Sequence, residues 1–311
     1  MPNHIYKDIG FTPEYSELFK DTAFGGEPCV FESSGIEYRF YKRPIEGTPY
    51  CDIVSPYGYS GPVRIHYYEL NQTADDYDYL SAFHKFCIKE NIVAEFARLH
   101  PFLENHRSLE PESVVQSGEV YYVDFTKPFE FDKGCKSAIR KAEKAGCMFY
   151  LSENSYDWTD FEKRYAFTMG RDGASNKYLF TPSFWARLET MSEAHLFGVQ
   201  FQKKTIAGCV ILTYGDYAHY FLAAAERNSG AGNFVLFEAI SWAKEAGYKI
   251  FNLGGGVHPN DSLASFKRSF SRLSKPFFTY RKTHNQAVYN QLCQAKGVDP
   301  DSEGFFPAYR R

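Results

Sequence analysis

Hydrophobic and polar residues alternate along several short stretches of the first half of the chain, and this pattern predicts β-strands. Between residues 35 and 65 the alternation is broken by proline and glycine, which predicts strands joined by turns. Two further stretches, 92–99 and 113–125, also read as strands. Between them and the first group, residues 75–90 carry apolar side chains at helical spacing behind an acidic start, so we expect a helix there.

The second half repeats this order of elements at greater length. Helical patterns at 157–169 and 182–191 lead into paired strands between residues 195 and 226, with turns at Lys203-Lys204 and Gly215-Asp216. A helix (233–247), a strand (248–254), a short helix (261–270) and a last strand (275–283) follow. Strand, strand, helix, strand, short helix, strand therefore occurs twice, which predicts a duplicated α/β (α+β) fold.

The predicted domains are residues 1–130 and 149–311, and the stretch 131–148 connects them. A helix in this stretch would align four cations on one face and three alanines on another: Lys133, Lys136, Arg140 and Lys144, and Ala138, Ala142 and Ala145. A charge run of this kind is usually the solvated face of a helix. The alternative is a basic patch that faces an anionic substrate, and the pattern leaves both interpretations open.

The composition of the chain mainly excludes classes of protein. The net charge of −3 over 311 residues disfavours a polyanion-binding or DNA-binding protein, so contact with tRNA or a nucleotide requires a local basic patch. Seven widely spaced cysteines without a C-x-x-C pair indicate reduced thiols. The amino-terminal sequence lacks the apolar core of a signal peptide, and no apolar run approaches the roughly 20 residues of a membrane span. We therefore expect a cytoplasmic protein without a transmembrane segment.

The segment RNSGAG, residues 227–232, is the best candidate for a phosphate-binding loop. It fits R-x-x-G-x-G and lies between a predicted strand and the long predicted helix. Glycines there would let backbone N–H groups approach a pyrophosphate at the amino end of the helix, where the helix dipole favours negative charge. Arg227, Gly230, Gly232 and Asn233 are the donor-binding candidates, and the alternative is a tight turn that holds no ligand.

Three consecutive glycines, Gly254 to Gly256, follow the next predicted strand but match neither the P-loop nor the dinucleotide fingerprint. They predict a sharp turn rather than a phosphate loop. Downstream, Lys267 and Arg268 on the short predicted helix have the charge to neutralise a phosphate or a developing oxyanion.

Other catalytic patterns are weak. The segment Gly58-Tyr59-Ser60-Gly61 is one residue short of a serine hydrolase elbow, and the nine histidines include no zinc-protease motif. We expect no metal site, and the sequence identifies no general base.

Five segments together resemble the Fem family (FemA/FemB/FemX-like) of peptidoglycan aminoacyltransferases, within the GNAT acyltransferase superfamily. They are SPYGYSGPV (55–63), KSAIRKAEKAGC (136–147), GRDG (170–173), GAGNFVLFEAISWAKEAGY (230–248), and FNLGGGV with DSLASFKRSF (251–270). The resemblance implies two tandem GNAT-like domains, each with a mixed central sheet flanked by helices. The first domain, which lacks R-x-x-G-x-G, is expected to be the degenerate one.

The resemblance also assigns residues. Lys267 matches the lysine of the family's Phe-Lys segment, which meets phosphate or stabilises the transferring group, so it is the catalytic candidate. Substrate-binding candidates on the acceptor side are Tyr57, Tyr59, Arg171, Tyr178 and Phe266. In this family an amine attacks an ester or thioester carbonyl directly, without a covalent enzyme intermediate.

The leading functional hypothesis is transfer of an aminoacyl or acyl group to an amine of a peptidoglycan or cell-surface glycan precursor. No tightly bound cofactor is expected, and the donor is either aminoacyl-tRNA or acetyl- or acyl-CoA. No long helical arm of the tRNA-dependent members is present, and RNSGAG is similar to a coenzyme A loop, so the donor stays open. The alternatives are an acetyl-CoA-dependent N-acetyltransferase acting on a small-molecule or sugar amine, and a non-catalytic module that binds a nucleotide-sugar or a partner protein.

Overall fold

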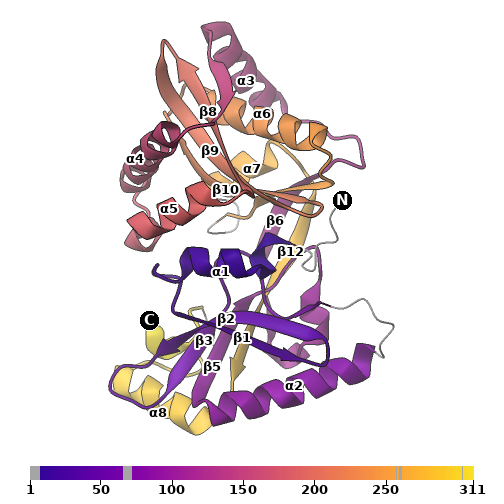
Figure 1. The fold of residues 1–311 in the computed structure, drawn as a ribbon, viewed down its shortest axis with the longest axis vertical. Helices are drawn as coiled ribbons and strands as arrows, with labels where there is room; N and C mark the ends of the chain where they lie inside the picture. Colours follow the sequence, from indigo (N-terminus) through magenta and orange to yellow (C-terminus); the bar gives the residue numbers. More distant parts are fainter. Residues whose placement is uncertain (1–7, 66–71, 257, 259–260, 303) are drawn as a thin grey trace. The chain divides into compact units, whose positions relative to one another are not determined.

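The computed structural model describes residues 8–65, 72–256, 258, 261–302 and 304–311 (Figure 1). The described chain forms two compact units. Unit 1 comprises Gly10–Ser117 and Pro276–Arg311, and unit 2 comprises residues 8 and 9 together with Gly118–Lys275. Among the described residues, no helix is both long enough and apolar enough to cross a membrane.

Unit 1 contains a mixed sheet with the strand order β1-β2-β3-β5-β12, and β4 pairs with β2. Its elements are α1 (Pro13–Phe19), β1 (Glu27–Ser33), β2 (Ile36–Pro44), β3 (Cys51–Val54), β4 (Val63–Arg64), α2 (Gln72–Lys89), β5 (Ile92–Arg98), the end of β12 (Ser274–Thr283) and α8 (Gln286–Lys296). Strands β3 and β5 are parallel and are joined through α2, whereas the other pairs are antiparallel. Helix α2 packs Tyr79, Phe83 and Cys87 into the aromatic core of this unit.

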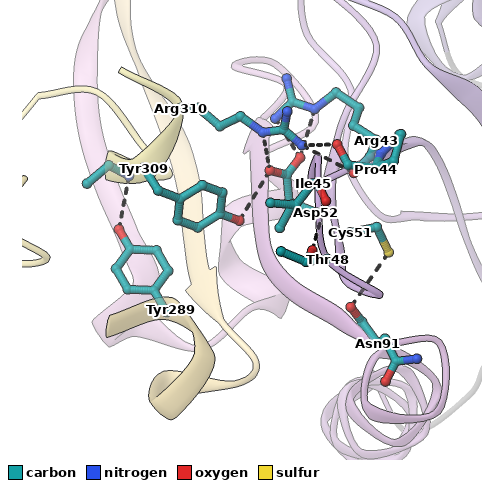
Figure 2. Close-up of polar contacts among 11 residues, drawn as sticks. Arg43, Pro44, Ile45, Thr48, Cys51, Asp52, Asn91, Tyr289, Tyr309 and Arg310 are labelled. Carbon is teal, nitrogen blue, oxygen red and sulfur yellow. Dashed lines mark hydrogen bonds and ion pairs between the residues drawn. The ribbon is translucent and has the colours of Figure 1, made fainter. Parts of the chain in front are cut away.

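The carboxyl-terminal segment is fastened to unit 1 through a buried carboxylate (Figure 2). Asp52, on β3, is completely buried and accepts hydrogen bonds from Arg310 Nε at 2.7 Å and from Tyr309 Oη at 3.2 Å. Arg43, on β2, donates to the same carboxylate at 2.8 Å. A buried carboxylate needs such partners, so Arg310 and Tyr309 tie the end of the chain to the first sheet.

In unit 2 the strand order is β6-β11-β10-β9-β8-β7, with both parallel and antiparallel pairs. Its elements are β6 (Val114–Asp124), α3 (Lys133–Ala145), β7 (Met148–Leu151), α4 (Ser155–Arg171), α5 (Pro182–Thr190), β8 (Ala194–Phe201), β9 (Lys204–Tyr214), β10 (Tyr217–Ala225), α6 (Ala231–Glu245), β11 (Ile250–Gly254) and α7 (Ser262–Arg268). Helices α3 and α6 lie side by side on one face of the sheet, and α4 and α5 cover the other (Figure 1).

The strands of the two units repeat one topology, which confirms the predicted duplication. In each unit three antiparallel strands are followed by a helix and by a strand parallel to the third: β1-β2-β3-α2-β5 in unit 1 and β8-β9-β10-α6-β11 in unit 2. A last antiparallel strand, β12 or β6, completes each sheet. The mixed α/β fold class is therefore confirmed.

These units divide the chain differently from the boundaries expected between 130 and 149. Residues 276–311 belong to unit 1, because β12 pairs with β5 and Arg310 binds Asp52. Helix α3, expected to connect the domains, lies within unit 2. The expected alanine face of this helix was also incomplete: its buried residues are Cys135, Ile139 and Ala142, which follow the four- and three-residue spacing, whereas Ala145 is exposed.

Candidate active site

The candidate site lies at the carboxyl ends of the two parallel strands of unit 2, β10 and β11. Their recorded pairs run from Tyr217 to His219 on β10, after which β10 bulges and continues along β9 to Ala225. Helix α6 provides the crossover between them. Ligands of open α/β sheets bind outside the carboxyl ends of such strands, so the segments that follow β10 and β11 are the ones to examine.

The segment after β10 is the predicted R-x-x-G-x-G loop. Gly230 has a φ of +77° and caps the amino end of α6. A Cβ at this position would overlap the carbonyl oxygen of Ala138 in α3, so only glycine permits both the left-handed backbone and the close approach of α3. The loop therefore leads directly into the first turn of α6, where Ala231 is buried and its backbone N–H donates to Ser229 Oγ at 3.1 Å.

Arg171 and Arg227, assigned from the sequence to different substrates, converge on one carboxylate. Arg227 Nη2 lies 2.6 Å from Asp172 Oδ1, and Arg171 binds both oxygens of Asp172 at 2.9 and 3.0 Å. Arg171 also donates to the carbonyl of Ala225, the last residue of β10, at 3.0 Å. These hydrogen bonds, led by the one from Arg171, lower the pKa of Asp172. Arg171 thus lies at the loop beside Arg227.

Helix α3 lies next to the same loop. Lys141 Nζ donates to the carbonyl of Asn228 at 2.7 Å. Lys133, Arg140 and Lys144 are exposed on this helix, while Lys136 pairs with Glu130. The basic helix is therefore solvated, as the first interpretation held, and it also borders the candidate phosphate loop, as the second requires.

The other two donor-binding candidates, Gly232 and Asn233, lie in the first turn of α6. Asn233 Nδ2 lies 3.7 Å from the Sγ of Cys135 in α3, which is a weak hydrogen bond. A Cβ on Gly232 would lie 3.2 Å from the Cβ of Ala225, so the loop packs closely at this point too. Asn233 therefore contacts the α3–α6 interface in this structure.

The segment after β11 is the glycine turn, Gly254 to Gly256, and it binds Lys267. Gly254 has a φ of +73°, and a Cβ on Gly255 would overlap the carbonyl oxygen of Glu119 in β6. Lys267 is 8% exposed and donates from Nζ to the carbonyl of Gly255 at 2.7 Å. Burial disfavours its ammonium and lowers the pKa of Lys267 to about 8, against a smaller opposing effect of Asp261.

Helix α7 holds this lysine in place through a cap and an apolar contact. Asp261 Oδ1 accepts from the backbone of Ala264 at 2.6 Å, and Oδ2 accepts from the backbone of His258 at 3.0 Å. Phe266 packs edge-on against Phe270, with ring centroids 5.2 Å apart, at the margin of the core. Phe266 therefore has a packing contact that anchors α7.

The remaining predicted residues lie elsewhere. Tyr57 and Tyr59 follow β3 in unit 1: Tyr57 packs against Phe24 at a centroid distance of 4.4 Å, and Tyr59 packs edge-on against Phe277 at 5.7 Å. Tyr178 ends a short 3₁₀ turn in unit 2, and Lys177 Nζ lies 5.3 Å from its ring centroid. Tyr57 and Tyr59 are thus substrate-binding candidates of unit 1, and Tyr178 is one of unit 2.

Sequence reasoning missed the role of Asp172, which joins the two arginines. The signal was its position directly after Arg171 in the GRDG segment. Burial raises the pKa of the thiols of Cys135 and Cys209, which makes them poor nucleophiles at neutral pH. Within the described residues, no three side chains of the metal-binding types are grouped so that they could hold an ion.

The chain is similar to known proteins in the sequence of one domain and in its fold. Residues 130–268 match the family model of the acetyltransferase (GNAT) domain, and this range falls within unit 2. A sequence search of curated proteins gave no match.

Several solved structures share the fold over nearly the whole chain. The crystal structure of FemX superposes with a TM-score of 0.69 at 14% identity and covers 91% of this chain and 94% of its own. The structure of L-PGS from Bacillus licheniformis gives 0.60 at 15% identity, covering 91% and 96%. The carboxyl-terminal domain of a putative lysylphosphatidylglycerol synthetase from Agrobacterium fabrum gives 0.57 at 16% identity, covering 90% and 91%.

The family match places the loop after β10, the glycine turn and Lys267 in one domain. Residues 130–268 are therefore similar to the acetyltransferase (GNAT) domain family, in a chain that shares the fold of FemX.

Proposed function

We propose that the protein is a Fem-like N-acyltransferase that moves an aminoacyl or acyl group onto an amine of a peptidoglycan or cell-surface glycan precursor. The observation that carries the proposal is the pair of segments at the carboxyl ends of β10 and β11. One presents Arg227 and the amino end of α6, and the other holds the buried Lys267. The similarity to FemX over 91% of the chain supports the same proposal.

The reaction requires little covalent chemistry from the protein. The acceptor nitrogen attacks the donor carbonyl carbon, a new C–N bond forms, and the C–O ester or C–S thioester bond breaks. The electron pair of the broken bond goes to the leaving group, which receives a proton as the attacking amine loses one. With a pKa of about 8, Lys267 is mostly an ammonium at pH 7, and in this proposal it stabilises the donor phosphate or the developing oxyanion.

The proposed donor is an aminoacyl-tRNA. Lys141 of α3 contacts the loop after β10 through its hydrogen bond to Asn228. The exposed cations of α3 therefore make a positive surface that is larger than a single pyrophosphate needs. A polynucleotide offers phosphates at the spacing that such a helix can contact.

Acetyl-CoA is the second candidate donor, and a separate observation favours it. The loop has the R-x-x-G-x-G spacing, and Gly230 is the residue before α6, so the loop lies at a helix amino end, the kind of place where a pyrophosphate binds. With this donor the protein would be an N-acetyltransferase of a small-molecule or sugar amine.

On the acceptor side we propose Tyr178, which lies in the same unit as Lys267. Its ring is partly exposed, and its polar end could meet a sugar or peptide. The Agrobacterium fabrum structure is the carboxyl-terminal domain of a putative lysylphosphatidylglycerol synthetase, so the assay also includes a lipid-linked acceptor with an amine or hydroxyl.

The test is a transfer assay read by mass spectrometry of the acceptor. Candidate acceptors, including UDP-muramoyl peptides, are incubated with charged total tRNA or with acetyl-CoA. We expect an added aminoacyl or acetyl mass with one donor. Lys267→Ala should lower the rate roughly 10²-fold or more, whereas Lys163→Ala, an exposed lysine of α4, should not.

Isothermal titration separates the alternatives. Micromolar binding of acetyl-CoA, together with an added acetyl mass, would select the thioester donor. Binding of the UDP-muramoyl peptide without turnover under either donor would contradict the proposal and support a binding module.

A further inference from the structure

A line of hydrogen bonds in unit 2 begins at a buried carboxylate near the start of the chain. Asp8 is 1% exposed. Its Oδ1 lies 2.8 Å from His219 Nε2, on β10, and accepts the backbone N–H of Ile9 at 2.7 Å. Residues 8 and 9 group with unit 2, although the chain from Gly10 onward belongs to unit 1. This short segment therefore brings a carboxylate to the parallel strands of the acyltransferase domain.

The hydrogen bonds continue from β10 to β11 at the last residue pair of this parallel ladder. His219 is the register partner of Asn252. Asn252 Nδ2 lies 3.1 Å from His219 Nδ1, and Asn252 Oδ1 accepts the backbone N–H of Gly254 at 2.9 Å. Asn252 is 2% exposed, so its amide depends on these partners.

The partners fix the direction of each bond. The oxygen of Asn252 faces an N–H donor, so its amide nitrogen must face the imidazole and donate to Nδ1. The proton of neutral His219 is then on Nε2 and is donated to Asp8. Because both ring nitrogens are engaged, His219 has no free nitrogen to take a proton from the acceptor amine, and a direct role as general base does not fit.

The line ends beside the catalytic candidate. Gly254 is followed by Gly255, whose carbonyl accepts from Lys267 Nζ at 2.7 Å. We propose that His219 is a positioning residue, oriented by Asp8, which acts through Asn252 to hold the Gly254–Gly256 turn in the conformation that binds Lys267. The catalytic consequence of this inference rests on the proposed function of Lys267, whereas the hydrogen bonds that link His219 to the turn do not depend on that function.

The physical need for such a restraint follows from the turn itself. Three glycines have more backbone freedom than any other three residues, so the turn would sample many conformations without an outside contact. Lys267 also has a long side chain on a helix of only seven residues. The amide of Asn252 fixes the first glycine, and His219 fixes the amide of Asn252.

The experiment follows the Nζ of Lys267 by ¹⁵N nuclear magnetic resonance of the full chain during a pH titration. Lys267→Arg assigns the signal. In the unmodified protein we expect titration near pH 8, as the burial of the ammonium dictates. In His219→Leu the turn loosens and water reaches the ammonium, so the titration should move toward 10.5. His219→Gln supplies one acceptor and one donor in similar places and should restore the original titration.

An unchanged titration in a folded His219→Leu protein would overturn the proposal. If that variant does not fold, Asp8→Asn serves instead, because the amide still accepts from His219 but without charge. It should move the titration in the same direction by a smaller amount, and no movement there would overturn the proposal equally.

A kinetic arm keeps this inference separate from the proposed function. Once a donor is found, His219→Leu should lower kcat roughly tenfold with little change in the donor KM, and His219→Gln should recover most of the rate. Absence of transfer by the unmodified protein would count against the proposed function alone. A normal kcat in His219→Leu, in a protein that does transfer, would count against this inference.

Discussion

The two glycine segments of unit 2 follow adjacent parallel strands, yet they are stabilised in opposite ways. After β11, the turn Gly254–Gly256 is pressed against β6 and is bound by the buried Lys267. After β10, residues 226–229 of the loop are held by ion pairs of exposed side chains, since Arg227 is 65% and Asp172 38% exposed, and Gly230 at the end of the loop is packed against α3. Buried contacts fix a geometry, whereas exposed ion pairs contribute little and exchange readily. The turn Gly254–Gly256 is suited to placing the charge of Lys267 precisely, and the loop after β10 is suited to reversible binding of a ligand.

Replacing a glycine by alanine should lower the free energy of unfolding much more in the turn after β11 than near the loop after β10. A Cβ on Gly255 meets the backbone oxygen of Glu119, which cannot move aside, so Gly255→Ala should lower the free energy of unfolding by about 3 kcal/mol. Gly232→Ala, in the first turn of α6 directly after the loop, should cost less than about 1 kcal/mol, because its closest new contact is a methyl group at 3.2 Å.

Chemical denaturation of both variants measures the difference. Gly134→Ala in α3 is the control: its Cβ meets nothing within 4 Å, so it should stabilise the protein by roughly 0.5–1 kcal/mol. Equal costs for Gly255→Ala and Gly232→Ala would remove the distinction between a locked turn and an exchangeable loop.

Replacing the buried lysine should stabilise the protein in a pH-dependent way. The pKa of Lys267 is lowered from 10.5 to about 8, so the unfolded chain binds more protons between these values. The free energy of unfolding contributed by this group therefore rises with pH from about 8 to 10.5, and its full cost is present below pH 8. Lys267→Met should gain on the order of 1–3 kcal/mol at pH 7.

The gain should shrink as the pH rises toward 10.5 and vanish above it, where the lysine is neutral in both the folded and the unfolded chain. Urea denaturation of the two proteins at matched pH values gives the difference directly, because other groups that titrate in this range are common to both. A gain that does not depend on pH would show that the ammonium of Lys267 is not desolvated.

Neutralising Asp172 tests whether the loop's ion pairs are exchangeable. Asp172 occupies the two arginines that a donor phosphate would use. We expect Asp172→Asn to tighten donor binding about fivefold and Arg227→Ala to weaken it about tenfold, as measured by titration calorimetry. Weaker binding in a folded Asp172→Asn variant would mean that the carboxylate itself contacts the donor or positions the loop.

The basic face of α3 should have the smallest effect. If the donor is an RNA, Lys133→Gln with Arg140→Gln should lower the affinity by a few fold and reduce the slope of log affinity against log salt by about 2. Lys163→Gln, on α4, should leave the slope unchanged. With acetyl-CoA as the donor, the α3 pair should change little.

Much of the fold could be predicted from the sequence, because most elements have a clear period. The strands within 35–65 and the helices α2 and α6 were expected close to their observed bounds. Helices α1 and α8 and strands β1 and β7 were not identified. Strand β1 has an exposed face and carries Glu27 and Glu32, and α8 depends on a capping asparagine and on a contact with Tyr309.

The candidate site was harder to predict, since its side chains meet only through long-range contacts. Lys267 and the loop residues came from the resemblance and from the glycine spacing. The convergence of Arg171 and Arg227 on Asp172 joins residues more than 50 positions apart, and the contact of Asp8 with His219 joins residues 211 positions apart. No local pattern encodes such contacts.

The most direct test of the division between the two segments is single-turnover transfer at varied donor concentration. Arg227→Ala should raise the donor concentration needed for half-maximal rate and leave the saturating rate nearly unchanged. Lys267→Ala should lower the saturating rate roughly 10²-fold and leave the half-maximal concentration within about threefold. The opposite assignment, with Arg227 controlling the saturating rate and Lys267 controlling donor affinity alone, would contradict the account.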